Sequence, residues 1–156
     1  MTTTAFATPE QARDYFAPLR RQGKSVVTTN GCFDIVHAGH IRYLIEAAAQ
    51  GDLLAVGINA DATVRQLKGV GRPIQRQEDR ALLISSLKMV ACAFIFADPN
   101  PIQFIEIIRP DVHVKGGDYP ENIIEKPAVE KYGGKVKIVA MHAGYSTSKI
   151  VRRIQG

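Results

Sequence analysis

The sequence has few cysteines, only Cys32 and Cys92 among its 156 residues. Two cysteines so far apart are too few for a disulfide framework or a cysteine-based zinc site. The sequence also lacks the run of roughly 18 apolar residues that a membrane-spanning helix needs. Its N-terminus has no basic segment before an apolar core, unlike a secretory signal peptide. We therefore expect a cytoplasmic protein with no membrane partner.

The charge balance is basic but not clustered. The formal net charge is +5 at pH 7 and the isoelectric point is about 9.4, with acidic residues interleaved among the basic ones. Nucleic-acid binding is compatible with this balance, but anionic small-molecule substrates explain it equally well. Charge alone does not decide between them. The length is that of one domain.

Another absence concerns a nucleotide-binding motif: no Gly-x-Gly-x-x-Gly segment follows any predicted strand, so the dinucleotide-binding fingerprint is missing. Amphipathic helical segments nevertheless alternate with apolar, β-branched runs. This pattern predicts an α/β protein, a three-layer Rossmann-like domain with a five-stranded parallel sheet. The predicted strands lie near residues 25–29, 52–59, 91–97, 111–115 and 135–140.

The first helix is predicted from the signals at its two ends. Thr8 is the expected N-cap, Pro9 the first helical residue, and Gln11 completes a capping box. Pro18 lacks a backbone N–H and should kink or end the helix. The segment 20–23, with its terminal glycine, should close it.

The segment between the first long strand and the following helix holds the strongest candidate site. Asn30-Gly31 is a turn signal, and His37 and His40 fall in the last loop residues and the first turn of an amphipathic helix. A helix N-terminus presents free N–H groups and a partial positive charge, both of which favour phosphate. We predict that His37 and His40 bind a polyphosphate.

Two other interpretations of the histidines remain open. A single histidine near a helix start is commonly a cap or a surface residue. A metal site would need a third ligand at the usual spacing, and neither cysteine nor carboxylate supplies it. The spacing His-x-Gly-His directly after a strand favours phosphate, and Gly39 leaves room for a ligand to approach the backbone. No metal-ligating residue is predicted.

Polar residues also follow two later strands. Ligands of open parallel sheets bind at the carboxyl ends of the strands. Asn59 and Asp61 are therefore site candidates, although capping of the helix near Ala62 explains them equally well. After the strand near 111–115, Lys115 and Asp118 should point into the same crevice. Gly116 and Gly117 permit close backbone approach. The candidates are Asn59, Asp61, Lys115, Gly116, Gly117 and Asp118.

Two segments offer further groups for phosphate. Residues 65–80 are basic and punctuated by glycine and proline, which predicts a partly mobile loop over the site. Lys68, Arg72 and Arg80 are its candidates for phosphate charges, although most basic surface loops are merely solvated. Arg80 is expected to open an apolar helix over 81–87. Ser146 and Thr147 begin the last helix, as caps or as a second set of phosphate donors.

The segment Asn30–His40, with its Gly-x-Phe-Asp and His-x-Gly-His motifs, resembles the signature of the HxGH nucleotidyltransferases of the cytidylyltransferase-like group. Further motifs over 67–73, 115–119 and 144–148 are most similar to the bacterial heptose 1-phosphate adenylyltransferases. The resemblance implies one nucleotidyltransferase domain over 1–156. Its implied activity is AMP transfer from ATP to D-glycero-β-D-manno-heptose 1-phosphate, in lipopolysaccharide core precursor synthesis.

The resemblance also implies further site residues and partners. The backbone near Gly31, Cys32 and Phe33 should line the nucleotide site, Asp34 and Asp118 should line it too, and Mg²⁺ should accompany ATP. Relatives are often oligomeric, so a homodimer is expected. No nucleic-acid partner is expected. In many bacteria a sugar kinase shares the chain, and 156 residues leave no room for one, so a stand-alone form is expected.

These motifs define the acceptor substrate and the base of the nucleotide less closely. Met141 stands where related glycerol-phosphate cytidylyltransferases carry an arginine, which argues against glycerol phosphate as acceptor. Two alternatives stay open beside the adenylyltransferase. One is a CTP-dependent transferase with another sugar- or alcohol-phosphate acceptor. The other is a non-catalytic nucleotide or RNA binder, which would bind without releasing pyrophosphate.

Overall fold

A computed structural model describes residues 4–120, 122–140 and 142–156. The comparison drawn at Met141 therefore lies outside the described residues. None of the helices in these three ranges has both the length and the apolar composition needed to cross a bilayer. The strands are β1 Ala5–Phe6, β2 Val26–Gly31, β3 Leu53–Asn59, β4 Cys92–Phe96, β5 Val112–Gly116 and β6 Lys135–Val139. The helices are α1 Pro9–Arg21, α2 Ala38–Ala48, α3 Asp61–Lys68, α4 Gln77–Ser85, α5 Ile102–Ile108, α6 Lys126–Glu130 and α7 Thr147–Gln155.

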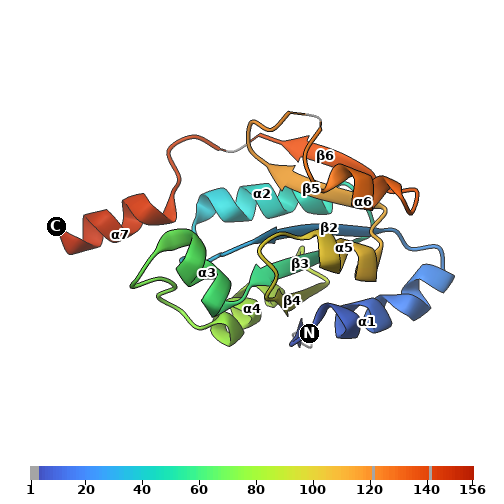
Figure 1. The fold of residues 1–156 in the computed structure, drawn as a ribbon, viewed down its shortest axis with the longest axis horizontal. Coiled ribbons are helices and arrows are strands. Elements are labelled where there is room, and N and C mark those ends of the chain that lie inside the picture. Colours follow the sequence, from blue (N-terminus) through green and yellow to red (C-terminus); the bar gives the residue numbers. More distant parts are fainter. Residues whose placement is uncertain (1–3, 121, 141) are drawn as a thin grey trace.

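All strands of the sheet run parallel, in the order β1-β4-β3-β2-β5-β6 (Figure 1). The predicted α/β fold with a parallel sheet is confirmed, and each of the five predicted strands is present. The predicted number is wrong by one, because β1 adds a sixth strand at the edge beside β4. A strand of two residues is too short to show a period of two, so its sequence carries no strand signal.

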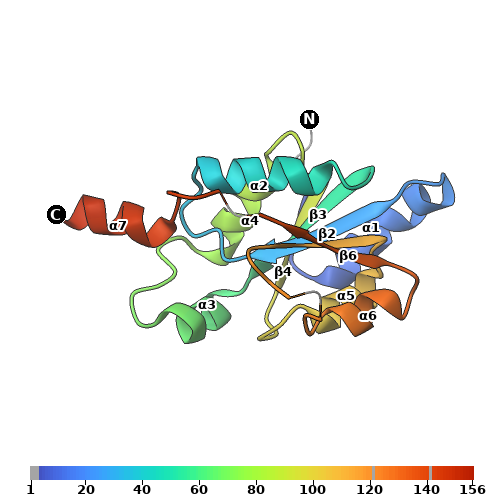
Figure 2. The same ribbon diagram turned by 90° about the horizontal axis from the view of Figure 1, so that it is seen from above.

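Helices cover both faces of the sheet, which gives the predicted three layers. Figure 2 shows the sheet nearly on edge, with α2 and α4 on one side and α5 and α6 on the other. One apolar core joins the first side to the sheet through residues such as Leu44 and Ile84. A second core, with Phe16 and Phe104, joins α1, α5 and α6 to the other face. Strands buried on both faces explain their nearly continuous apolar sequences.

Helix α1 begins as predicted but does not end at its proline. Thr8 caps it with a complete capping box. Pro18 lies inside the helix, which continues to Arg21, so it does not terminate the helix. The guanidinium of Arg20 donates to the backbone oxygens of Ile108 (3.2 Å) and Arg109 (2.7 Å). These bonds fix the last turn of α1 against the end of α5.

His113 is a core residue of β5 and is fully buried. Its Nδ1 lies 2.9 Å from the hydroxyl of Thr28 on β2, and its Nε2 has no partner within the described residues. Burial, with a smaller effect of the Lys115 charge, lowers the pKa of His113 to about 3. The folded protein therefore keeps this imidazole neutral where an unfolded chain would protonate it.

This low pKa predicts an acid-sensitive core. Between the ordinary pKa of histidine, 6.5, and the folded value, only the unfolded state takes up the proton, so stability falls as the pH falls. For His113 the loss from pH 8 to pH 5 should be about 2 kcal/mol in the free energy of unfolding. Urea denaturation at the two pH values measures it. A His113→Gln variant should show a smaller loss between them, and an equal loss would contradict the assignment.

Candidate functional site

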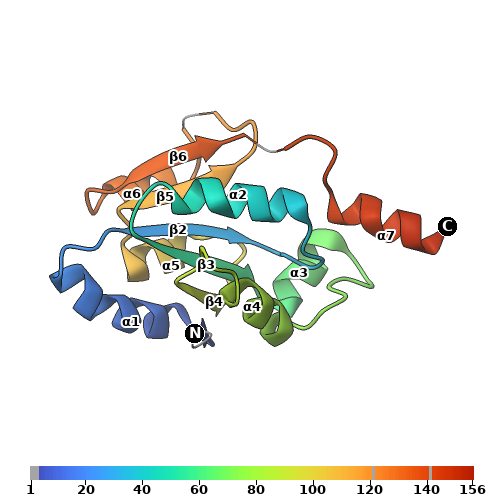
Figure 3. The ribbon, with the colours of Figure 1, turned by 180° about the vertical axis from the view of Figure 1, so that it is seen from behind.

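The carboxyl ends of the central strands meet at one edge of the sheet. In the register of β2 and β3, Asn30 lies beside Gly57 and Gly31 beside Ile58, so the two strands end together. Figure 3 shows the tips of the β2, β5 and β6 arrows pointing to the end where α2 begins and where α3 and α7 lie. The predicted site segments therefore converge from separate parts of the chain.

His37 and His40 cap the start of α2 through each other's backbone. His37 is the N-cap residue, and its Nδ1 accepts from the N–H of His40 (3.3 Å), while the Nδ1 of His40 accepts from the N–H of His37 (3.4 Å). The rings stack with centroids 3.7 Å apart. Because each Nδ1 accepts a hydrogen bond, the proton of each neutral ring is assigned to Nε2. Capping thus leaves an Nε2–H donor on each ring for a ligand.

These histidines are neutral donors at pH 7. Burial lowers the pKa of His40 to about 4, with a further contribution from the neighbouring His37, and burial also lowers the pKa of His37. Two cations at stacking distance would repel each other, and a protonated Nδ1 would face a backbone N–H. The free positive charge near α2 therefore comes from the helix N-terminus and from the basic residues nearby.

Gly39 is explained by packing as well as by ligand access. A Cβ at this position would lie 2.6 Å from the Cβ of Tyr145 and 3.0 Å from ring atoms of His37. The ring of Tyr145 also stacks on that of His37, with centroids 6.0 Å apart. The glycine therefore lets the segment before α7 approach the histidine pair.

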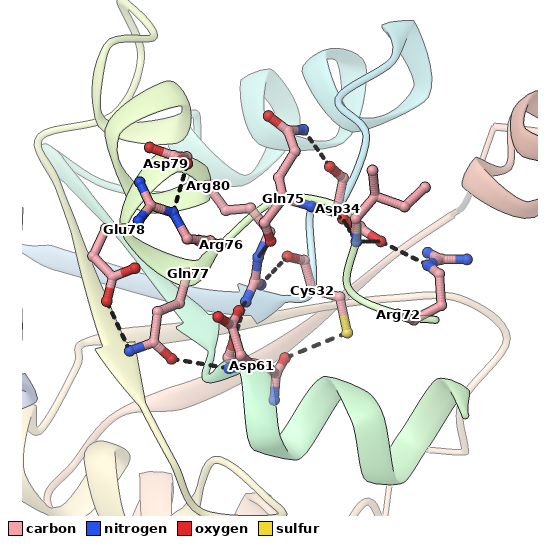
Figure 4. A network of polar contacts seen from close by, with 12 residues as sticks. Cys32, Asp34, Asp61, Arg72, Gln75, Arg76, Gln77, Glu78, Asp79 and Arg80 are labelled. Carbon is pink, nitrogen blue, oxygen red and sulfur yellow. Dashed lines mark hydrogen bonds and ion pairs between the residues drawn. The ribbon is translucent and has the colours of Figure 1, made fainter. Parts of the chain in front are cut away.

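Arg80 holds several parts of the site together from inside the protein (Figure 4). Its side chain is fully buried and donates to the backbone oxygens of Cys32 (2.6 Å), Asn59 (2.8 Å) and Gln75 (3.0 Å). The guanidinium also pairs with Asp61 at 2.7 Å. Arg80 lies inside the first turns of α4, which begins at Gln77, and does not open that helix as predicted. Asp61 makes no side-chain cap for α3, which removes the capping interpretation.

Asp34 fixes the loop between α3 and α4, also drawn in Figure 4. Its buried carboxylate accepts from Arg72 Nε (2.6 Å) and from the backbone N–H groups of Ile74 and Gln75. Burial alone would raise its pKa, but these hydrogen bonds and the Arg72 charge outweigh it, so the pKa of Asp34 is lowered. The basic segment 65–80 is therefore two helix ends around a tethered loop, 69–76, rather than one loop throughout.

These contacts predict that Asp34 holds the loop 69–76 in place. An Asp34→Asn variant loses the negative charge that holds Arg72 and one of the acceptor sites for the loop's N–H groups. Hydrogen exchange of the Ile74 and Gln75 amides should become roughly tenfold faster or more. Asp79→Asn, at an exposed carboxylate that pairs with Arg76, is the matched control and should leave both amides unchanged. Equal protection in the Asp34 variant would contradict the tether.

Three cavities adjoin at this edge. A central cavity of about 170 Å³ is lined by Asn30, Gly31, Cys32, Phe33, Gly39, His40, Tyr43 and Gly116. A basic cavity of about 190 Å³ is lined by Cys32, Phe33, Asp34, His40, Lys68, Arg72, Thr147 and Ser148. A polar cavity of about 370 Å³ shares three residues with the central one, Asn30, Tyr43 and Gly116. The central and basic cavities are both lined by His40, and the central cavity adjoins the polar one. Together the three cavities offer space for two substrates bound end to end.

Some predicted residues lie away from these cavities. Asp118 is exposed, and neither it nor Gly117 lines any of the three. Ser146 caps α7 by accepting from the N–H of Lys149, whereas Thr147 lines the basic cavity and donates to the oxygen of Ile35. Asn59 and Lys115 line the polar cavity. The roles assigned to all these residues stay predictions.

Several cavity residues were not predicted from the sequence, among them Tyr43, Ser148 and Glu125. Tyr43 lies on α2 at i+3 from His40, so helical spacing could have indicated it. Ser148 directly follows the predicted Ser146 and Thr147, so the run of hydroxyl residues at the start of α7 could have indicated it. Glu125 carries no local signal, because its position depends on the path of the chain between β5 and α6.

Comparison with known proteins agrees with this geometry. Residues 28–153 match the model of the cytidylyltransferase-like family. The chain belongs to this family. It is therefore a nucleotidyltransferase domain, as the motif at residues 30–40 predicted. The match begins within β2 and ends within α7, so it includes every element around the three cavities.

Individual relatives are more informative about the branch of the family. The chain is 44% identical over 146 residues to the bifunctional protein HldE of Syntrophotalea carbinolica, covering 93% of this chain and 30% of that protein. It is 49% identical over 138 residues to HldE of Wolinella succinogenes, covering 88% and 28%. The chain thus spans less than a third of the length of these relatives.

A solved structure supports the same fold. The crystal structure of the lipopolysaccharide core biosynthesis protein from Thermoplasma volcanium superimposes with a TM-score of 0.64 at 33% identity. The match covers 77% of this chain and 98% of that one. The Rossmann-like nucleotidyltransferase fold is therefore shared over almost the entire length of the solved protein.

Proposed function

We propose that the protein transfers AMP from ATP to D-glycero-β-D-manno-heptose 1-phosphate, forming ADP-heptose and pyrophosphate. The observation that carries this proposal is the stacked histidine pair at the start of α2. Capping leaves the Nε2–H of each ring available as a donor, and His40 of this pair lines the basic cavity. Similarity to the HldE proteins supports the sugar phosphate as acceptor.

The nucleophile of this reaction needs little activation. A sugar phosphate has a second pKa near 6, so at neutral pH its oxygen is largely anionic. It attacks the α-phosphorus of ATP, the bond from that phosphorus to the bridging oxygen breaks, and pyrophosphate leaves with the electron pair. The protein must align the two substrates and offset negative charge on the leaving group. No general base and no covalent enzyme intermediate are required.

The side chains around the basic cavity suit the leaving group. His40 offers a neutral N–H donor, and the free N–H groups of α2 add a partial positive charge. Lys68 and Arg72 line the cavity and carry full charges. Arg72 is also held by Asp34, so its guanidinium is already oriented before ATP binds. Arg80 is a positioning residue that holds the cavity walls in place, because all its assigned contacts are within the protein.

Magnesium fits this site as a companion of ATP. Among the residues that the structure describes, no group of three or more histidine, cysteine or carboxylate side chains could hold a metal ion. Asp34 is engaged by Arg72 and two backbone N–H groups. Mg²⁺ commonly binds through substrate phosphates with few protein ligands, and there it offsets phosphate charge. We therefore expect ATP to bring the ion into the basic cavity.

The proposal is tested by pyrophosphate release with Mg²⁺ and pairs of substrates. ATP and CTP are each combined with the heptose 1-phosphate, with other sugar 1-phosphates and with glycerol 3-phosphate. Turnover should require ATP and be highest with the heptose. A preference for CTP or for another acceptor would agree with nucleotidyltransferase activity but reject the proposed substrates. Nucleotide binding without pyrophosphate release from any pair would favour the non-catalytic binder.

A further inference from the structure

We propose that the polar cavity holds the hydroxyl-bearing part of a sugar phosphate and that Glu125 is the residue that distinguishes its hydroxyl groups. This inference rests on the proposed function, because it assigns the acceptor half of the same site. It deepens that proposal by naming a residue that neither the sequence motifs nor the family match singles out.

Glu125 is an unusual residue to find in this position. Its side chain is only 1% exposed, and one carboxylate oxygen contacts the ammonium of Lys115. The other oxygen, Oε2, is buried and has no hydrogen-bond partner within the described residues. A buried carboxylate oxygen without a partner is costly. Since Glu125 lines the polar cavity, a ligand donor in that cavity would remove the cost.

The chemistry of the cavity selects the kind of ligand. A carboxylate accepts hydrogen bonds and repels anions, so the group beside Glu125 should be a neutral O–H donor rather than a phosphate. The amide side chains of Asn30, Asn59 and Asn100 also line the cavity. The side-chain oxygen Oδ1 of Asn100 accepts from the N–H of Ile102 (3.1 Å), which leaves the side-chain NH₂ group free to donate. Alternating donors and acceptors of this kind suit a polyhydroxylated sugar.

The position of the cavity agrees with an acceptor role. It shares Asn30 and Gly116 with the central cavity, and the central cavity is lined by His40. A sugar bound beside Glu125 would therefore extend its phosphate toward the histidines. Lys115 is held by Glu125 and lies 4.6 Å from the centre of the Tyr119 ring, which fixes one wall of the cavity. The phosphates of ATP would lie on the other side of His40, in the basic cavity.

Direct binding measurements test the assignment without relying on turnover. Isothermal titration calorimetry compares the heptose 1-phosphate with analogues that each lack one hydroxyl. Wild-type protein should bind at least one of these analogues roughly tenfold more weakly than the full sugar, because a hydrogen bond to a charged group is lost. The Glu125→Gln variant should bind the full sugar roughly tenfold more weakly and no longer distinguish that analogue. Its affinity for ATP should stay within twofold.

A matched control is available on the surface. Glu106 also pairs with a lysine, Lys131, at 3.2 Å, but this pair is exposed and away from the cavity. Glu106→Gln should therefore leave sugar binding and hydroxyl discrimination unchanged. Thermal unfolding of both variants shows whether folding is retained. The wild-type analogue series needs no substitution, so it tests the inference even where a variant is unstable.

The two proposals fail in different ways. The assignment of Glu125 is overturned when wild-type protein binds every deoxy analogue as well as the full sugar, or when Glu125→Gln retains the wild-type discrimination. If pyrophosphate release persists in either case, the proposed transferase activity is still supported. Discrimination that depends on Glu125, in a protein without turnover, supports the sugar site and rejects the proposed reaction. A loss of ATP affinity instead of sugar affinity would assign the cavity to the nucleotide and overturn the inference.

Discussion

Replacing His40 with alanine is expected to lower the turnover number for pyrophosphate release by roughly 10²-fold, or about 3 kcal/mol in the activation barrier. The variant loses the Nε2–H donor at the junction of the central and basic cavities. It also loses the Nδ1 acceptor that caps the backbone of His37. Steady-state kinetics with saturating ATP and heptose 1-phosphate measure the effect, and circular dichroism and thermal unfolding check the fold.

Two further substitutions separate these contributions. The Oδ1 of asparagine can replace the Nδ1 acceptor near the backbone, but asparagine has no donor at the distance of Nε2. Glutamine can place an N–H near the position of Nε2 and loses the capping acceptor. His40→Gln should therefore retain more activity than His40→Asn, whereas His40→Asn should retain more stability. Greater activity in the asparagine variant would show that capping, rather than donation to phosphate, is the main role of His40.

His142 supplies a matched control for the loss of a histidine. Its Nε2 lies 2.8 Å from a carboxylate oxygen of Glu46, and it lines none of the three cavities. His142→Ala should keep nearly the wild-type turnover number. The pH profile adds a second check. Because the pKa of His40 is about 4, its protonation should not account for a loss of activity between pH 7 and pH 6, whereas protonation of the acceptor phosphate should.

The sequence predicted those features of the fold that depend on local pattern. Alternating apolar strands and amphipathic helices gave the parallel sheet and its three layers, and Thr8 and Gln11 gave the start of α1. Features that depend on distant contacts were not predicted. Pro18 remains inside α1, whose last turn is held by the bonds of Arg20 to the end of α5. The two-residue strand β1 exists because β4 offers it a paired edge.

The site shows the same division. His37, Gly39 and His40 lie in one short motif, and the structure places them together at the start of α2. The partners of the charged residues could not be read from sequence. Arg72 and Asp34 are 38 positions apart. Lys115 and Glu125 meet only because the chain turns back after β5. The basic residues predicted for the site therefore differ in their partners: Arg72 pairs with Asp34, Arg80 with Asp61 and Lys115 with Glu125.

Arg80 is expected to give the largest loss of stability. An Arg80→Met variant keeps much of the side-chain volume but removes every donor to Cys32, Asn59 and Gln75, whose carbonyl oxygens it binds. It also leaves Asp61 without its cation. Unsatisfied buried polar groups cost about 1–3 kcal/mol each, partly offset by relaxation and water. We expect the free energy of unfolding to fall by about 3 kcal/mol and the melting temperature by roughly 10 °C.

The size of this effect follows from burial, so an exposed arginine of the same region is the proper comparison. Arg76 pairs with Asp79 at 3.4 Å, and 78% of its side chain is exposed. Arg76→Met should change the stability by less than about 0.5 kcal/mol. The stability of Arg80→Lys should lie between those of Arg80→Met and Arg76→Met, because one ammonium cannot reach acceptors from three separate segments at once. Urea denaturation of the three variants measures this order.

Kinetics of the same variants decide whether Arg80 positions the site or binds phosphate itself. A positioning residue should lose stability and turnover together in Arg80→Met, and Arg80→Lys should recover part of both. A phosphate ligand would give a different result, with stability near wild type and a raised KM for ATP. The four contacts of Arg80 join the segment just after β2, the end of β3, the loop 69–76 and α3. Loss of these contacts should therefore displace Asn59 and Cys32 at the cavity walls, which is why we expect stability and turnover to fall together.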